Sequence, residues 1–205
     1  MLYYDGEKGG ISLQSETKRL DAVAEILAGV GGFDPSGTYE YELVQPNSFS
    51  DTGELAALEV QRRSEPVSAK QMLSAGDVLV KRLNPSFVHV VGDGGAQMVA
   101  SQNLLVVRPG PEVDPLYLGC LLEQKEIIGQ IEHVTGTSSV IKAISLKKLG
   151  EIMIPVIPMA EQRSLGRFWQ ISRKRKRLLR EYIEESDNLL SAAVSKTING
   201  GGNKR

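Results

Sequence analysis

The sequence predicts an α/β (α+β) fold, a mixed-sheet domain followed by one long C-terminal helix. Short β-rich runs bounded by Gly, Pro, Asn or Asp alternate with helical patterns over residues 1–158. Residues 160–195 contain no Pro and a single glycine, Gly166, and their apolar residues recur at helical spacing. The chain of 205 residues is long enough for one good core and a smaller second module. We therefore expect a domain over 1–158, a helix over 159–198 and a flexible tail over 199–205.

The first expected element is a helix over residues 15–28, because Leu20, Val23 and Leu27 share one helical face and Gly29 follows as a stop signal. Strands are expected next, at residues 77–80, 88–91, 104–107 and 152–154. Between the last two strands, a proline opens a helical apolar stripe over residues 115–131.

The last expected element is a helix from Ala160 to about Ser195 with a heptad register, which polar residues interrupt at Ser172, Lys176 and Ser186. At 1.5 Å per residue it is about 50 Å long, too long to be covered by a domain of this size. Its seam is expected to contact a partner helix through Leu165, Trp169, Leu179, Ile183 and Leu190.

Charge is distributed unevenly along the chain. Residues 1–160 carry 13 Lys and Arg against 20 Asp and Glu, whereas residues 161–205 carry 11 against 5. The two parts are therefore built for different neighbours. A single cysteine and two histidines, with no pair at ligand spacing, argue against a disulfide or a zinc site. With no apolar run long enough to cross a bilayer and no signal-peptide pattern, we expect a cytoplasmic protein without a membrane partner.

The stretch NPSF at residues 84–87 is similar to the [D/N]-P-P-[Y/F] loop with which amino-methyltransferases hold an extruded base. Such an enzyme also needs a Gly-rich turn before a helix to hold S-adenosylmethionine. The candidate turn, GDGGAQ at residues 92–97, lacks the last glycine, follows NPSF and does not lead into a helix. We therefore expect no cofactor and no catalysis by this chain.

Two other function classes are alternatives. A Mg²⁺-dependent nuclease would use Glu112, Glu123 and Lys125, which are similar to a P-[D/E]…[D/E]-x-K motif. The second half of that motif should lie on a strand, but here it falls in a helical pattern. A purely structural helical adaptor would bind no DNA at all.

Five segments in order resemble the DNA-specificity (S) subunit of type I restriction-modification systems: RLDAVAEILAG, GDVLVKRLNPSF, ASQNLLVVRP, DPLYLGCLL and TGTSSVIKAISLKKLGEIMIPVIPMAEQ, followed by a long helix. The resemblance spans nearly the whole chain, and LKKLGEIMIPVIPMAEQ is its most specific piece. It implies a non-catalytic target recognition domain that reads half of a split DNA site, and a spacer helix that docks adenine methyltransferase (M) subunits. The usual S subunit is about twice as long, with two such domains and two helices.

The resemblance therefore implies a half-subunit that pairs as a homodimer through its helix, with the two copies antiparallel. Its implied partners are double-stranded DNA and M subunits, and a restriction (R) subunit is left open. The implied DNA contacts are Arg62, Arg63, Lys81, Arg82, Asn84, Gln102, Asn103, Thr137, Ser138, Ser139 and Lys142.

Arg offers a planar fork for guanine O6 and N7 or for phosphate, and Asn pairs with adenine. Residues 1–60 carry 11 Asp and Glu against 3 Lys and Arg, so the DNA face should lie within 61–160 and its intrinsic affinity should be weak. The basic run at residues 173–177 fits a solvated helix face as well as a phosphate or partner contact.

Overall fold

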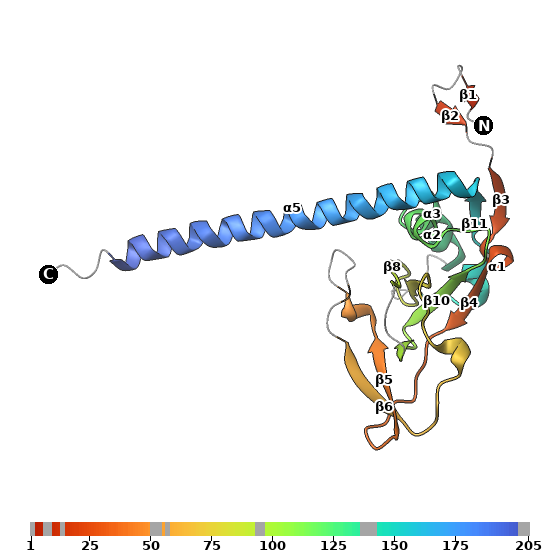
Figure 1. The fold of residues 1–205 in the computed structure, drawn as a ribbon, viewed down its shortest axis with the longest axis horizontal. Coiled ribbons are helices and arrows are strands. Elements are labelled where there is room, and N and C mark those ends of the chain that lie inside the picture. The colour runs from red at the N-terminus through yellow and green to blue at the C-terminus, as the bar shows by residue number, and fades with distance from the viewer. Residues whose placement is uncertain are drawn as a thin grey trace. The chain divides into compact units, whose positions relative to one another are not determined.

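The computed structural model of the chain describes residues 3–5, 10–12, 15–49, 55, 58–92, 97–135 and 143–200 (Figure 1). Two compact units are present, Met1–Trp169 and Gln170–Arg205. The strands are β1 (Tyr3–Asp5), β2 (Gly10–Ser12), β3 (Glu16–Arg19), β4 (Ala24–Ala28), β5 (Tyr39–Val44), β6 (Glu59–Arg63), β7 (Val78–Lys81), β8 (Phe87–Val90), β9 (Met98–Ala100), β10 (Leu104–Pro109) and β11 (Met153–Val156). The helices are α1 (Leu20–Val23), α2 (Pro115–Leu122), α3 (Lys125–Thr135), α4 (Leu146–Gly150) and α5 (Met159–Gly200), with 3₁₀ turns η1 (Pro46–Ser48) and η2 (Ala69–Gln71). The predicted α+β class with one long C-terminal helix is confirmed.

A four-stranded antiparallel sheet in the order β4-β10-β7-β8 forms the centre of the first unit. The strands predicted at 77–80, 88–91, 104–107 and 152–154 are confirmed as β7, β8, β10 and β11. Because β7 and β10 are inner strands with both faces covered, they read as uninterrupted apolar runs in the sequence.

The two faces of this sheet pack against different layers. Successive side chains of a strand point to opposite faces, so Val78 and Val80 join the core formed with α2, α3 and α4, whereas Leu79 joins a second core with β5 and β9. A smaller mixed sheet, β6-β5-β9, contributes to that second core and pairs β5 parallel to β9. Helices α2 and α3 thus lie on one side of the central strands, and β5 and β6 lie on the other (Figure 1).

The helix predicted over residues 15–28 is wrong, since this segment forms two strands joined by the single turn α1. Strand β3 pairs with β11 and β4 pairs with β10, both antiparallel. The backbone is extended on either side of the turn, with ψ of 144° at Arg19 and 148° at Ala24. Two distant strands each offer a hydrogen-bonded ladder, and this tertiary pairing overrides a helical pattern that local propensity supports only weakly.

The helical stripe predicted over residues 115–131 is present, but as two helices with a break at 123–124. Helix α2 begins at the expected proline, and the carboxylate of Asp114 accepts hydrogen bonds from two backbone N–H groups of the first turn at 3.0 Å. Both helices contribute buried residues to the same core, and the break lets each turn its own apolar face toward it.

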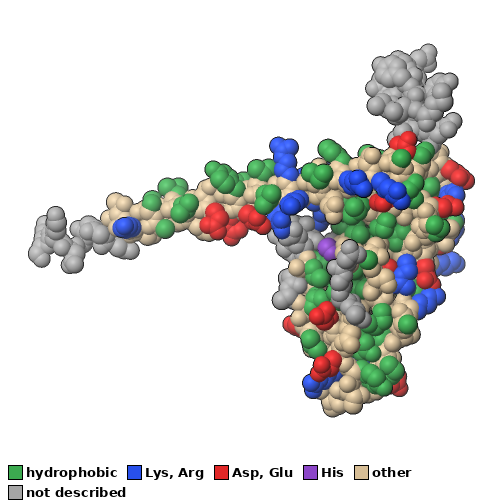
Figure 2. All heavy atoms as spheres, viewed as in Figure 1, with side chains coloured by type: hydrophobic (Ala, Val, Ile, Leu, Met, Phe, Trp, Pro, Cys, Tyr) green, Lys and Arg blue, Asp and Glu red, His purple; other side chains and the backbone are tan. Residues whose placement is uncertain are grey.

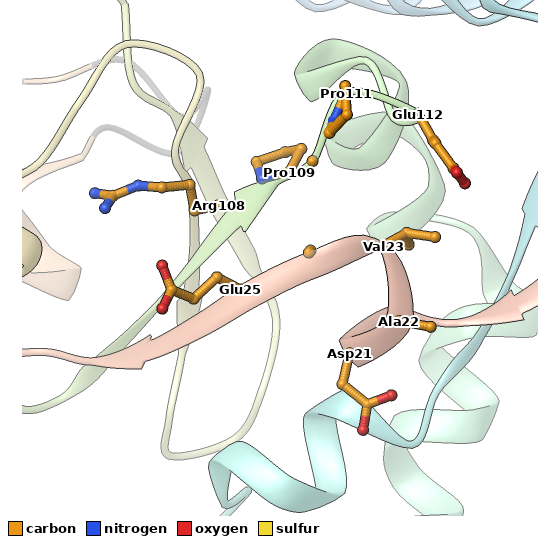
Figure 3. A pocket seen from close by; sticks show the side chains of 10 residues that line it. Asp21, Ala22, Val23, Glu25, Arg108, Pro109, Pro111 and Glu112 are labelled. Atoms are coloured by element: carbon orange, nitrogen blue, oxygen red, sulfur yellow. The ribbon is translucent and has the colours of Figure 1, made fainter.

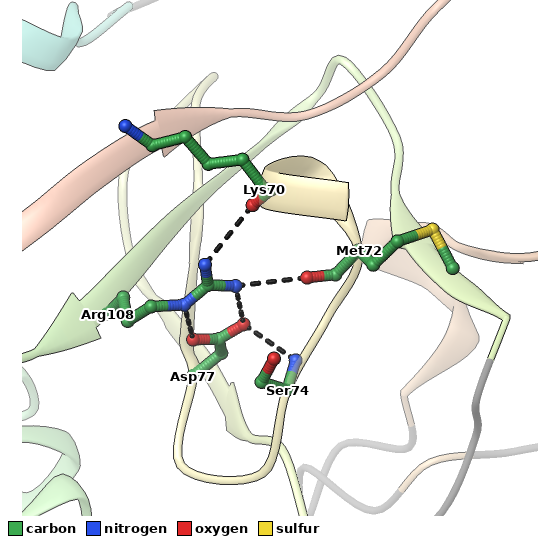
Figure 4. A network of polar contacts seen from close by, with 5 residues as sticks. All are labelled: Lys70, Met72, Ser74, Asp77 and Arg108. Atoms are coloured by element: carbon green, nitrogen blue, oxygen red, sulfur yellow. Dashed lines mark hydrogen bonds and ion pairs between the residues drawn. The ribbon is translucent and has the colours of Figure 1, made fainter. Parts of the chain in front are cut away.

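An ion pair between Arg108 of β10 and Asp77, which directly precedes β7, connects the turn η2 to these two strands (Figure 4). The carboxylate of Asp77, which is 1% exposed, accepts hydrogen bonds from Nε and Nη2 of Arg108 at 2.8 Å. The same guanidinium donates to the backbone carbonyls of Lys70 and Met72 at 3.2 and 3.0 Å. Every acceptor in this network is therefore bound by a charged donor, which stabilises the connection between η2 and β7.

Helix α5 begins inside the first unit, where it packs closely on α2. The amide of Gln162, 1% exposed, donates from Nε2 to the carbonyls of Glu112 and Ile157 at 2.8 and 2.7 Å, and its Oε1 accepts from the backbone N–H of Asp114 at 2.8 Å. A Cβ at Gly166 would lie 2.8 Å from the Leu116 side chain, so glycine permits the close approach of the two helices. None of the helices in the described residues is both long and apolar enough to cross a membrane.

Candidate nucleic-acid interface

The end of β7 and the start of β10 lie side by side and carry several of the predicted DNA contacts. Lys81 pairs with Leu104 in the sheet, and the backbone N–H of Arg82 donates to the carbonyl of Asn103 at 2.9 Å. Arg82, Gln102 and Asn103 are all exposed. The structure therefore brings a guanidinium and two side-chain amides together at one end of the central sheet.

The loop after β4 lies against the same turn. Gly29 donates its N–H to the carbonyl of Leu104 at 3.1 Å, and Val30 donates to Ala100 at 2.7 Å. A Cβ at Gly31 would lie 2.8 Å from Oε1 of Gln102, so the amide of Gln102 lies over this glycine. Gly29 to Gly32 were not among the sequence-predicted site residues, although the GVGG stretch is a signal for close backbone approach.

The two neighbouring arginines of β6 differ in their surroundings. Arg62 binds Glu40 across the β5–β6 pair, with Nη2 at 2.6 Å from Oε1. Arg63 lies over the ring of Phe33, with its guanidinium carbon 5.9 Å from the ring centroid. A Cβ at Gly32 would lie 3.9 Å from Nη2 of Arg63. Arg63 is therefore placed beside the loop of residues 30–33, called the glycine loop below, whereas the charge of Arg62 is neutralised by Glu40 of β5.

The other predicted contacts are not all brought to this edge. Lys81 is half-buried within β7, and Asn84 adopts a left-handed backbone conformation with φ of 46°. Residues Thr137, Ser138, Ser139 and Lys142 lie outside the described residues. Ala143, the next described residue, forms an antiparallel bridge with Leu83.

The aromatic residue of NPSF belongs to the protein core rather than to an exposed loop. Phe87 is half-buried and meets Trp169 edge to face, with ring centroids 5.3 Å apart. Both rings lie over Gly119 of α2, where an added Cβ would come within 3.1 Å of Phe87 and 2.9 Å of Trp169. A ring packed in this way is not available to stack on an extruded base, unlike the aromatic ring of the methyltransferase loop.

The side chains predicted for the helix seam fall into two groups. Trp169 is half-buried and donates from Nε1 to a carboxylate oxygen of Glu123 at 2.7 Å, so its partners lie within the first unit. Leu165, Leu179, Ile183 and Leu190 are exposed. Figure 2 shows hydrophobic side chains recurring along this helix between charged ones.

A second exposed apolar row, which the heptad analysis missed, accompanies the seam. It comprises Phe168, Ile171, Leu178, Tyr182 and Leu189. These positions repeat at steps of three, four and seven residues, so they share a stripe of the helix next to the predicted seam. The helical spacing of these apolar residues is the sequence signal that indicates this row.

The carboxylates of the nuclease alternative have structural partners. Glu112 binds Nζ of Lys18 at 2.8 Å, and Glu123 accepts from Trp169. Within the described ranges, no group of three or more His, Cys, Asp or Glu side chains is arranged to hold a metal ion. The predicted nuclease set is therefore not assembled by the residues that would form it.

A hollow of about 520 Å³ lies between α1 with β4 and the end of β10 (Figure 3). Its charged lining residues are Asp21, Glu25, Arg108 and Glu112. Each of them is ion-paired: Asp21 with Arg19 at 2.6 Å, Glu112 with Lys18, Glu25 with Lys70 and Arg108 with Asp77. The hydrogen bonds from Arg19 lower the pKa of Asp21 below its usual value. All four charged side chains of this hollow therefore have an ion-pair partner.

Comparison with known proteins identifies the fold. No family model matches the sequence, and no curated protein matches it. A chain from a structure of the type I R-M system, described for its complex assembly and conformational transition, aligns with a TM-score of 0.68 at 17% identity, covering 93% of this chain and 46% of that one. The HsdS subunit from Thermoanaerobacter tengcongensis aligns with a TM-score of 0.61 at 18% identity, covering 89% and 49%.

The type I restriction-modification S subunit from M. genitalium aligns with a TM-score of 0.57 at 17% identity, covering 90% of this chain and 46% of that one. The chain thus has the fold of one half of these proteins and spans about half of their length.

Proposed function

We propose that this chain is the DNA sequence reader of a type I methyltransferase or restriction complex, without catalytic activity of its own. The observation that carries the proposal is the fold: about nine-tenths of this chain aligns with one half of two proteins described as S subunits. The cluster of Arg82, Gln102 and Asn103 beside the glycine loop supports it, because these side chains offer the donors that read base edges and clamp phosphates.

The direct test is selection of a DNA sequence. Full-length protein is incubated at low salt with a pool of randomised duplexes, and the bound fraction is sequenced. We expect enrichment of one short sequence, with an affinity that falls steeply as salt rises, because phosphate neutralisation supplies much of the binding free energy. A bound fraction with the composition of the input pool would contradict the proposal and favour a purely structural adaptor.

Lys81 and Arg82 carry the first test of where DNA binds. In the Lys81→Ala/Arg82→Ala variant we expect weaker DNA binding with an unchanged fold, because Arg82 is exposed and the sheet bonds at this point come from the backbone. Loss of a bidentate base contact costs about 1–3 kcal/mol at one base position, whereas loss of a phosphate contact weakens all sequences alike. Unchanged affinity and unchanged preference would mean that DNA binds on another surface.

The absence of catalysis is tested separately. Purified chain is mixed with S-adenosylmethionine and DNA, and methyl transfer is followed by mass spectrometry. We expect none, because the sequence lacks a Gly-rich cofactor turn that leads into a helix and Phe87 of NPSF is packed in the core. Methyl transfer by protein free of any methyltransferase subunit would overturn this part of the proposal.

The helix is proposed to join two copies of the chain and to dock the methyltransferase subunits. The chain spans about half the length of the two S subunits that it matches. We propose that a second copy, related by a two-fold axis, supplies the other reader and the other helix. The exposed seam of Leu179, Ile183 and Leu190 supports pairing of helices, and the second apolar row offers further surface for the M subunits. An antiparallel pair would set the readers at opposite ends of a rod and read an interrupted palindrome.

Sedimentation of the full chain tests the pairing. We expect a dimer at tens of micromolar that the Leu179→Asp/Ile183→Asp variant converts to monomer, because two charges replace two apolar contacts of the seam. Lys174→Asp is the matched control, since Lys174 is exposed and lies outside both apolar rows. A monomeric wild-type chain, or an unchanged mass in the double variant, would refute the paired-helix proposal. A selected DNA site without inverted symmetry would contradict it independently.

A further inference from the structure

The glycine loop, residues 30–33, places Gly31 and Gly32 between two polar side chains. Its first residue is anchored by the hydrogen bond from Val30 to Ala100 at 2.7 Å and by a parallel bridge to Ser101. Gly32 has a φ of +72°, a conformation that side chains rarely adopt. The two glycines carry no side chain of their own, so the groups that border them are the amide of Gln102 on one side and the guanidinium of Arg63 on the other.

Among the described residues, Arg63 packs on an aromatic ring and has no carboxylate as an ion-pair partner. Its side chain is half-buried, and the guanidinium lies 5.9 Å from the centroid of the Phe33 ring. Its Nε is buried and has no hydrogen-bond partner in the part of the chain that the structure describes. Most buried donors in folded proteins are paired, and arginines 62 and 108 of this chain are each bound to a carboxylate. The position of Arg63 is therefore set by packing, and its charge is not neutralised by a carboxylate of the described residues.

The nearby carboxylate of Asp34 is bound by other groups. It accepts hydrogen bonds from the backbone N–H and the hydroxyl of Ser36, both at 2.9 Å, and from the hydroxyl of Ser64 at 3.4 Å. These donors lower the pKa of Asp34, so the carboxylate is ionised and turned toward its own loop at neutral pH. Arg63 thus faces the glycine loop with its terminal nitrogens as the charged donors of that edge.

We infer that Arg63 is the residue that selects a guanine in the DNA half-site, with the Gln102 amide bordering the same position across Gly31. A guanidinium fork matches the two acceptors O6 and N7 that guanine presents in the major groove, and a fork that is already fixed loses little freedom on binding. The glycines let the base edge reach the fork without a clashing side chain. Arg82, which is exposed at the end of β7, provides a charge for phosphate.

This inference rests on the proposed function, and the same selection experiment separates the two. Full-length wild type, Arg63→Lys and Arg63→Ala are each taken through selection from randomised duplexes, and affinities for the selected site and for its single-position variants are measured by fluorescence anisotropy. Arg19→Ala is the matched control, because its guanidinium is exposed and bound to Asp21 and Arg19 is not among the implied DNA contacts. Far-UV circular dichroism and the unfolding midpoint verify that each variant is folded.

We expect wild type to require G·C at one position and Arg63→Lys to lose that requirement, with discrimination there falling roughly 5- to 150-fold, because lysine keeps the charge and loses the fork. Arg19→Ala should keep the wild-type preference. Gly31→Ala should alter preference at the same or the adjacent position, because the new Cβ would displace Oε1 of Gln102, the end of a flexible side chain.

The opposing outcomes are distinct. A uniform loss of affinity for all sequences in Arg63→Lys would assign Arg63 to phosphate and overturn the inference while leaving the proposed function intact. An unchanged selected sequence in both Arg63 variants would overturn it as well. A wild-type chain that selects no sequence would refute the proposed function, and the inference would fall with it.

Discussion

Gln162 makes the connection between the domain and the long helix sensitive to a single side chain. Replacing it with methionine keeps the length and shape of the side chain but removes both donors and the acceptor. The buried carbonyl of Ile157 and the partly buried carbonyl of Glu112 and N–H of Asp114 then lose these partners. An unpaired buried polar group costs about 1–3 kcal/mol, so after partial relaxation we expect a loss of about 3 kcal/mol in the free energy of unfolding.

The measurement uses the one tryptophan of the chain. Trp169 lies two turns beyond Gln162 and packs on Phe87, so its fluorescence reports on this end of the helix during urea unfolding. For a domain of this size the expected loss corresponds to a fall of about 6–12 °C in the unfolding midpoint. The same replacement at Gln170, which is exposed, should change stability by less than about 0.5 kcal/mol.

A loss below about 1 kcal/mol in Gln162→Met, or a loss equal to that of the Gln170 control, would refute this reasoning. It would mean that the carbonyls and the N–H find water or new partners when the amide is removed, and that the start of the helix is held by apolar packing alone.

Three further outcomes follow from the buried polar groups. Asp77→Ala should lower the free energy of unfolding, measured by urea titration, by about 2–4 kcal/mol, because Arg108 loses its carboxylate in a partly buried site. The control Glu40→Ala, which breaks an exposed ion pair, should lower it by less than about 1 kcal/mol. Burial raises the pKa of the Cys120 thiol, so alkylation at pH 8 should be slower in folded than in urea-unfolded protein, and equal rates would contradict this. Burial also raises the pKa of Tyr117 to about 12 from the usual 10.0. The contribution of the neutral Tyr117 to the free energy of unfolding should be fully present below pH 10 and lost as pH rises toward 12. An ultraviolet titration in which all tyrosines ionise together near pH 10 would disprove this prediction.

The sequence pattern was sufficient to predict an element where that pattern depends on the element alone. Strands β7 and β10 are uninterrupted apolar runs because both of their faces are covered, so composition and boundary residues identified them. The long helix could be predicted for a related reason, since an α-helix makes its backbone hydrogen bonds within itself. The close pairing of Arg82 with the turn at Asn103 also follows from the order of strands, although the sequence alone gave these residues only as separate candidates.

The sequence by itself determined the fold class, the positions of β7, β8, β10 and β11, and the extent of the helix. Tertiary structure alone decided that residues 15–28 form β3, α1 and β4, because the ladders that hold them come from β11 and β10 more than 70 residues away. It also decided that Arg62 binds Glu40 while Arg63 lies over the ring of Phe33. The contact of Trp169 with Glu123 of its own domain was decided in the same way. A side chain's type specifies what it is able to bind, but its actual partner depends on groups brought near it by contacts distant in sequence.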